Sequence, residues 1–144
     1  MTTSLSRLKR MGRVGVAAMA LSASMLVVAP ATDAAAATAR NGVCESGEFC
    51  LYYLTDRSGS VSDFSGSIAD YGATQPSCYE FRGVGAGQGL CVKNNAESVW
   101  NRSSHAVRVY FHRSYGGASQ LVAAGESGDL NATLFNKNAS HKFL

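Results

Sequence analysis

The chain has 144 residues, and its 13 Lys and Arg against 10 Asp and Glu give a formal net charge of +3. Four of the basic residues and one acidic residue lie within residues 1–39, so residues 40–144 hold nine charges of each sign and have no net charge. A neutral domain has no overall field that attracts polyanions, which excludes nucleic acid and anionic membranes as expected partners.

Residues 1–39 predict a secretory signal peptide. An apolar run over residues 14–29 is followed by alanine-rich cleavage signals and preceded by a basic head formed by Arg7, Lys9, Arg10 and Arg13. The apolar run is shorter than the roughly 20 residues that cross a bilayer, so a membrane anchor is not expected. Cleavage after Ala37 or Ala39 leaves residues 40–144 as one secreted, extracellular domain.

Residues 40–144 predict an all-β domain, because no segment shows sustained helical periodicity. Short alternating or aromatic-rich runs are separated by clusters of Gly, Ser, Asn and Asp, a pattern typical of a β-sandwich or barrel. The expected strands, in chain order, are residues 49–54, 61–64, 79–82, 90–93, 107–112, 119–123 and 130–135.

All four cysteines lie in this domain. An even number of cysteines in an exported chain predicts two disulfides, and three pairings are open. We favour Cys44–Cys50 together with Cys78–Cys91, because each of these bonds closes a short local loop. Neither spacing fits a metal site of the C-x-x-C type.

Residues 44–101 and 105–144 resemble each other, which predicts two similar four-strand motifs. In each motif an aromatic strand, around Tyr52 or Tyr110, runs through a turn to a glycine. The first motif is the longer one because it alone contains residues 78–91, which read as a strand, a glycine-rich excursion and a returning strand.

The second motif carries a recognisable signature. Tyr110, Tyr115 and Gly117 fit the aromatic-x4-aromatic-x-Gly pattern of the βγ-crystallin Greek key, in which the glycine permits a folded-back hairpin. The first motif matches this pattern in part, because Arg57 stands where the second aromatic residue is expected. The resemblance implies a disulfide-bonded, βγ-crystallin-like double Greek-key sandwich.

The start of the domain resembles a narrower family, the small secreted metallopeptidase inhibitors of actinobacteria that have this fold. In these proteins a C-x5-C pair with an internal glycine leads into the first aromatic strand, as Cys44, Gly47 and Cys50 do here. Residues 96–101 also resemble the closing strand of their first motif. The resemblance implies a monomeric inhibitor of an extracellular peptidase, with no enzymatic activity of its own.

The resemblance does not fix the inhibitory residues. The best-studied inhibitor of this kind presents a Cys-Val bond in a small disulfide loop of the second motif, whereas no cysteine follows Cys91 here. A Cys-Val pair does occur in the first motif, beside the longer loop, and the tip of that loop is an alternative. Glycines at residues 83–89 argue against a rigid loop. The candidate inhibitory residues are Glu80, Phe81, Arg82, Leu90, Cys91 and Val92.

Calcium is a second functional hypothesis, since βγ-crystallin motifs bind it through an Asn/Asp-Asn/Asp-x-x-Ser/Thr-Ser stretch. Asn94, Asn95 and Ser98 match this stretch, although Val99 replaces its last serine. Catalysis is not expected, because the histidines show neither a triad nor a zincin pattern. The alternatives to an inhibitor are therefore a calcium-binding structural module and a killer-toxin-like antimicrobial protein.

Overall fold

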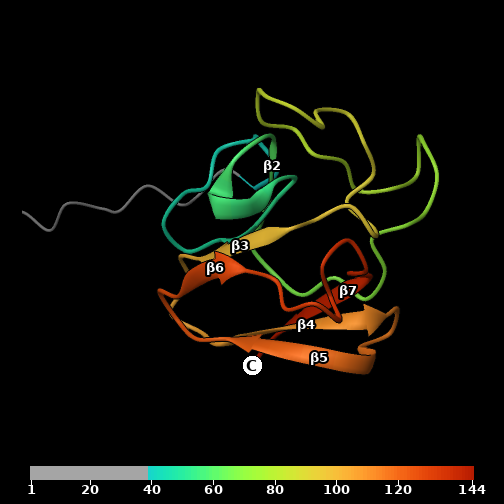
Figure 1. Cartoon of the computed structure of the whole chain (residues 1–144). Helices are drawn as coiled ribbons and strands as arrows, with labels where there is room; N and C mark the ends of the chain where they lie inside the picture. Colours follow the sequence, from blue (N-terminus) through green and yellow to red (C-terminus); the bar gives the residue numbers. More distant parts are fainter. Residues whose placement is uncertain (1–38) are drawn as a thin grey trace, which may run out of the picture. The chain divides into compact units, whose positions relative to one another are not determined.

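Seven short strands form two antiparallel sheets in the computed structural model, which describes residues 39–144 (Figure 1). The signal peptide predicted for residues 1–39 lies, apart from Ala39, outside the described residues. A short 3-10 helix, η1 (Thr55–Arg57), follows the first strand, and no helix within residues 39–144 is long and apolar enough to cross a membrane. The strands are β1 (Phe49–Tyr52), β2 (Val61–Phe64), β3 (Ser98–Asn101), β4 (Val107–His112), β5 (Gly116–Val122), β6 (Ser127–Asp129) and β7 (Ser140–Phe143).

The two motifs exchange segments between their sheets. The first sheet has the order β2-β1-β3-β6 and the second has the order β5-β4-β7. Strand β6 belongs to the second motif but pairs with β3 of the first. In return, Ile68 of the first motif forms a bridge with His141 of β7. This is the arrangement of a double Greek-key sandwich, as expected from the sequence.

Four of the observed strands agree with predicted ones. Strands β2 and β4 have the predicted bounds, and β1 and β5 overlap their predicted segments. The strand predicted for residues 130–135 is wrong. Asn131 Oδ1 accepts hydrogen bonds from the backbone N–H groups of Thr133 and Leu134, both at 3.1 Å, so the chain turns there instead of extending.

Both faces of β1 are buried. Phe49 and Leu51 point into the main core between the sheets, as expected for alternate residues of a strand. Cys50 and Tyr52 point to the opposite face and pack against Trp100. Strand β1 is therefore covered on its outer face as well, where Cys44 of the disulfide-closed segment and Trp100 pack against it.

The turn after the aromatic strand is built in the same way in the two motifs. Ser98 Oγ donates to the Leu54 carbonyl oxygen at 2.6 Å and accepts from the Arg57 N–H at 2.9 Å. Ser140 Oγ makes the equivalent bonds to the His112 carbonyl at 2.7 Å and from the Tyr115 N–H at 3.2 Å. The residues bonded in this way include Arg57 (φ 57°) and Tyr115 (φ 59°), both in the left-handed region.

Arg57 replaces the aromatic residue expected in the turn of the first motif, and the aromatic ring of the corner lies on the closing strand instead. The Arg57 guanidinium carbon lies 4.8 Å from the centroid of the Trp100 ring, whereas in the second motif Lys142 Nζ lies 5.5 Å from the Tyr115 ring. The first motif thus has the cation in the turn and the ring on the closing strand, and the second motif has the reverse. Both motifs therefore have a cation–π contact at this corner, and in the first motif Arg102 also lies over the Trp100 ring, 4.6 Å from its centroid.

Candidate functional site

Residues 78–91 form a loop that a disulfide closes at its base. The Cys78–Cys91 bond joins Cα atoms 5.6 Å apart, and the Cys44–Cys50 bond joins Cα atoms 5.9 Å apart. The favoured disulfide pairing is therefore confirmed. In Figure 1 the yellow-green chain between β2 and β3, which includes this loop, extends well beyond the two sheets.

The two sides of the loop pair irregularly around the disulfide. The Val92 N–H donates to the Tyr79 carbonyl at 2.8 Å, and the Phe81 N–H donates to the Leu90 carbonyl at 2.9 Å. The regular strands predicted for residues 79–82 and 90–93 are absent from the described structure, where a single bridge joins Glu80 and Cys91. The glycine-rich segment prevents the two sides from continuing as a ladder.

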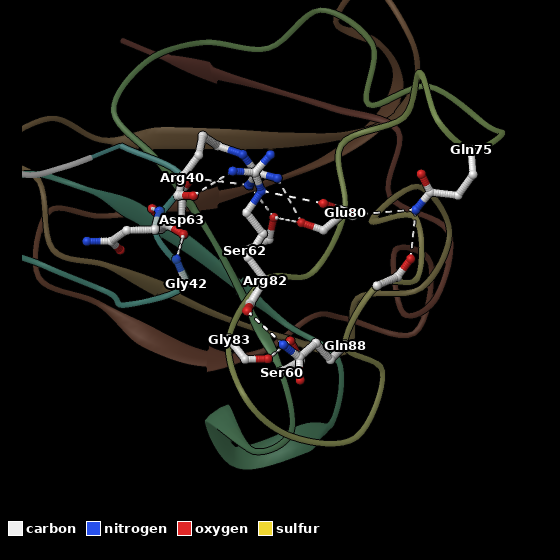
Figure 2. A network of polar contacts seen from close by, with 12 residues as sticks. Arg40, Gly42, Ser60, Ser62, Asp63, Gln75, Glu80, Arg82, Gly83 and Gln88 are labelled. Carbon is white, nitrogen blue, oxygen red and sulfur yellow. Dashed lines mark hydrogen bonds and ion pairs between the residues drawn. The ribbon is translucent and has the colours of Figure 1, made fainter.

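The tip of the loop is bonded to the edge of β2. The N–H groups of Arg82 and Gly83 both donate to the Val61 carbonyl oxygen at 2.9 Å. On the other side of the tip, the Ser60 N–H donates to the Ala86 carbonyl at 2.8 Å, and the Ser60 hydroxyl donates to the Gly83 carbonyl (Figure 2). Residues 82–86 are thus held at both ends.

The glycines of the loop allow close packing. A Cβ atom at Gly83 would lie 2.6 Å from Val61 Cγ1, and one at Gly87, where φ is +87°, would overlap the Tyr53 ring. The backbone therefore approaches β2 and Tyr53 more closely than a residue with a side chain would allow. We expected these glycines to loosen the loop, but their contacts instead fix it against the domain.

Arg40 joins the start of the domain to the base of the loop. Its guanidinium carbon lies 4.5 Å from the centroid of the Phe64 ring and 5.2 Å from that of the Tyr79 ring. Its Nη2 donates to the Glu80 carbonyl at 2.7 Å, and its Nη1 donates to the Ser62 hydroxyl (Figure 2). Burial lowers the pKa of Arg40, against the attraction of Asp63, but a guanidinium remains charged in proteins.

Asp63 fixes the backbone beside Arg40. Its carboxylate is fully buried and accepts hydrogen bonds from the N–H groups of Asn41 at 2.9 Å and Gly42 at 2.8 Å. Arg82 completes the network, because its Nη1 donates to the Arg40 carbonyl at 2.9 Å. The loop base and the first residues of the domain therefore support each other through charged groups.

The candidate inhibitory residues separate into buried and exposed groups. Phe81 and Val92 are fully buried in the main core, so the Cys91–Val92 bond does not offer its valine side chain to a peptidase. This corrects the expectation that either apolar residue is presented at the surface. Leu90 is 46% exposed, and Arg82 forms an ion pair with Glu80 at 3.6 Å on the surface.

Val84 is the exposed apolar residue that the sequence analysis missed. Its side chain is 92% exposed, between Gly83 and Gly85 at the tip of the loop. The available signal was an isolated branched residue within a run of glycines. That signal is weak, because the sequence alone does not show that the flanking glycines are bonded to β2.

Two of the three residues of the calcium hypothesis, Asn95 and Ser98, have side-chain partners in the protein. Asn95 Nδ2 donates to the carbonyls of Cys91 at 2.9 Å and Lys93 at 3.3 Å, and the Ser98 hydroxyl holds the turn after β1. Asn94 has a left-handed φ of 62°. Residues 39–144 contain no group of three His, Cys, Asp or Glu side chains that could hold a metal ion. Calcium binding stays a prediction.

Comparison with solved structures finds the same fold. A structure of the eye lens βγ-crystallin domain fold aligns with 72% of this chain and 93% of its own, with a TM-score of 0.55 and 15% identity. A βγ-crystallin from Ciona intestinalis aligns with 68% of this chain and 100% of its own, with a TM-score of 0.48 and 13% identity. The search of curated proteins gave no match.

Comparison with family models identifies the group to which the chain belongs. The model of peptidase inhibitor family I36 matches residues 37–122, which is more than half of the chain and includes the whole of the disulfide-closed loop. The fold and the two disulfides agree with this match. The chain therefore belongs to peptidase inhibitor family I36, whose members are not enzymes.

Proposed function

We propose that this protein is a secreted, monomeric inhibitor of extracellular metallopeptidases, and that it acts by placing the loop of residues 78–91 in the active-site cleft. Membership of a peptidase inhibitor family supports the inhibitory role. Two disulfides suit an extracellular protein. The metallopeptidase target follows from the resemblance of the Cys44–Cys50 region to inhibitors of that class.

The observation that carries the proposal is that the loop is held in place before any peptidase binds. The Cys78–Cys91 disulfide closes its base, the edge of β2 holds its tip, and Arg40 holds the Glu80 carbonyl. Binding otherwise requires flexible groups to be ordered, at about 0.5–1.5 kcal/mol for each immobilised side chain. A loop that is already ordered avoids much of this cost.

A panel of purified peptidases, with thermolysin-like metallopeptidases and serine peptidases as its two arms, tests the proposal. The wild-type protein should inhibit metallopeptidases at near-stoichiometric concentration and leave the serine peptidases active. Inhibition of serine peptidases alone would show that the target class is wrong. If no peptidase in the panel is slowed, the proposed function itself is refuted.

A pair of disulfide variants tests the role of the loop. The double variant Cys78→Ser, Cys91→Ser opens the loop, whereas Cys44→Ser, Cys50→Ser removes a disulfide outside it. Both changes lower stability, by about 2–4 kcal/mol for a typical disulfide, so inhibition is compared at a temperature where circular dichroism shows both variants folded. We expect a much larger loss of inhibition from the first variant. Equal losses would show that the loop is not the contact region.

A further inference from the structure

We infer that Val84 is the anchor of the inhibitor, inserted into an uncharged apolar pocket of the target, and that it acts as a plug that is not cleaved. The inference rests on the proposed function, and it adds the contact residue, the chemistry of the pocket and the fate of the loop. Three features of the loop support it.

The first feature is the exposure of the side chain. Val84 is 92% exposed, whereas the other exposed large aliphatic residues of the described chain range from 36% at Leu54 to 56% at Val43. A protein gains nothing for its own stability from an aliphatic side chain in this position. On binding, however, almost the whole side chain can be removed from water, and burial of a valine corresponds to roughly a 10- to 100-fold gain in affinity.

The second feature is the frame around the side chain. Gly83 and Gly85 flank Val84, so no neighbouring side chain keeps the walls of a pocket away from it. The frame is also fixed, because a Cβ at Gly83 would lie 2.6 Å from Val61 and one at Gly85 would lie 3.0 Å from the backbone of Gly59. Val84 is therefore presented alone, on a backbone that rests on β2.

The chemistry of the tip also defines the pocket. Residues 83–89 contain no charged side chain. The nearest charge along the chain is Arg82, whose guanidinium is engaged with the Arg40 carbonyl and the Glu80 carboxylate. A peptidase pocket that prefers a small branched aliphatic side chain fits this tip, whereas a pocket with a buried carboxylate or cation does not.

The third feature is the direction of the peptide groups. The Gly83 N–H donates to Val61 of β2, the Gly83 carbonyl accepts from Ser60, which precedes β2, and the Gly85 carbonyl accepts from the Gln88 N–H at 3.2 Å. Gly85 has φ +142°, far from the extended values of about −120° to −140°. These peptide groups are therefore not free to pair with a peptidase as those of an extended substrate do, and the chain is not extended at Gly85.

The test compares Val84→Asp and Val84→Ala with the control Leu121→Asp, which changes an exposed aliphatic residue of β5 in the other sheet. Inhibition constants are measured against a peptidase that the wild-type protein inhibits. We expect Val84→Ala to weaken inhibition about 10-fold and Val84→Asp by 100-fold or more. Urea unfolding should be unchanged in both, and Leu121→Asp should inhibit as the wild type does.

The outcomes separate the two proposals. If the wild-type protein inhibits no peptidase, the proposed function fails and the anchor fails with it. If the wild type inhibits and Val84→Asp inhibits equally well, only the anchor is overturned. Mass spectrometry after prolonged incubation with the target tests the plug: an intact chain supports it, and a cut within residues 82–86 shows that the loop is processed as a substrate.

Discussion

The buried imidazole of His141 predicts that the domain loses stability in mild acid. The ring is fully buried, and its centroid lies 4.9 Å from that of Phe49 and 4.8 Å from that of Phe64. Its Nε2 lies 2.9 Å from the Gly66 carbonyl oxygen, and its Nδ1 lies 2.8 Å from the Tyr71 hydroxyl. Because a carbonyl only accepts, Nε2 carries the proton of the neutral ring and Nδ1 accepts from Tyr71.

The magnitude follows from the pKa of this ring. Burial lowers the pKa of His141 from 6.5 to about 3, because the charged ring would lose its hydration, and the positive charge of Arg40 acts in the same direction. The unfolded chain therefore binds a proton near pH 6.5, whereas the folded chain does not until about pH 3. Within this window each pH unit removes about 1.4 kcal/mol from the free energy of unfolding, or about 3 kcal/mol by pH 4.5.

Urea unfolding of the wild type and of His141→Gln, at about pH 7.5 and about pH 4.5, measures this effect. A glutamine can donate to Gly66 and accept from Tyr71, but it does not titrate. We expect the wild type to lose about 3 kcal/mol more than His141→Gln on acidification, and the exposed-site control His105→Gln to behave as the wild type does. Parallel losses in the wild type and His141→Gln would refute the argument, because other groups would then cause the acid sensitivity.

Three further predictions concern the turns, the loop and calcium. Ser140→Ala should lower the free energy of unfolding by about 1–3 kcal/mol, because two partly buried hydrogen bonds are lost, whereas the exposed Ser104→Ala should change it little. Equal free energies of unfolding for the two variants would contradict the role of Ser140. Gly87→Ala should lower the melting temperature by several degrees, because the added Cβ overlaps a tyrosine ring. The control Gly128→Ala, whose Cβ meets no atom within 4 Å, should not lower it. An unchanged melting temperature for Gly87→Ala would show that the loop is loose. Asn95→Ala should lower the melting temperature equally in EDTA and in calcium chloride, because its amide bonds two backbone carbonyls; a decrease confined to calcium chloride would instead support a calcium site.

Short-range sequence patterns predict the bounds of two strands and the pairing of the cysteines. The bounds of β2 and β4 follow from short runs between turn residues, and the pairing of the cysteines follows from the proximity of their partners in the chain. The hairpin corner at Tyr115 and Gly117 was recognisable from its resemblance to the βγ-crystallin signature, and Gly117 has a left-handed φ of 76° that glycine adopts readily.

Long-range contacts determine the features that could not be predicted from the sequence. Strand β6 has the sequence Ser-Gly-Asp, which has little strand propensity, and it is extended because the edge of β3 binds it. The burial of Phe81 and Val92 likewise depends on how the loop packs over the core. Within residues 78–92 only the flanking glycines distinguish Val84 from these two apolar residues, although Val84 has the opposite environment.

The insertion in the first motif has two structural consequences that arise from the same hydrogen bonds. Strand β2 lies at the edge of its sheet, and an unpaired edge is a site where other chains can add. Residues 82–86 bond to Ser60 and Val61 at this edge, and the same bonds turn the chain so that Val84 points away from the domain. The same hydrogen bonds therefore protect the edge of β2 and present Val84. A change that releases the loop from β2 should weaken inhibition and also promote self-association. The second motif has the same corner without the insertion. The inhibitory role is therefore assigned to the inserted loop, which only the first motif has, and not to the fold that the two motifs share.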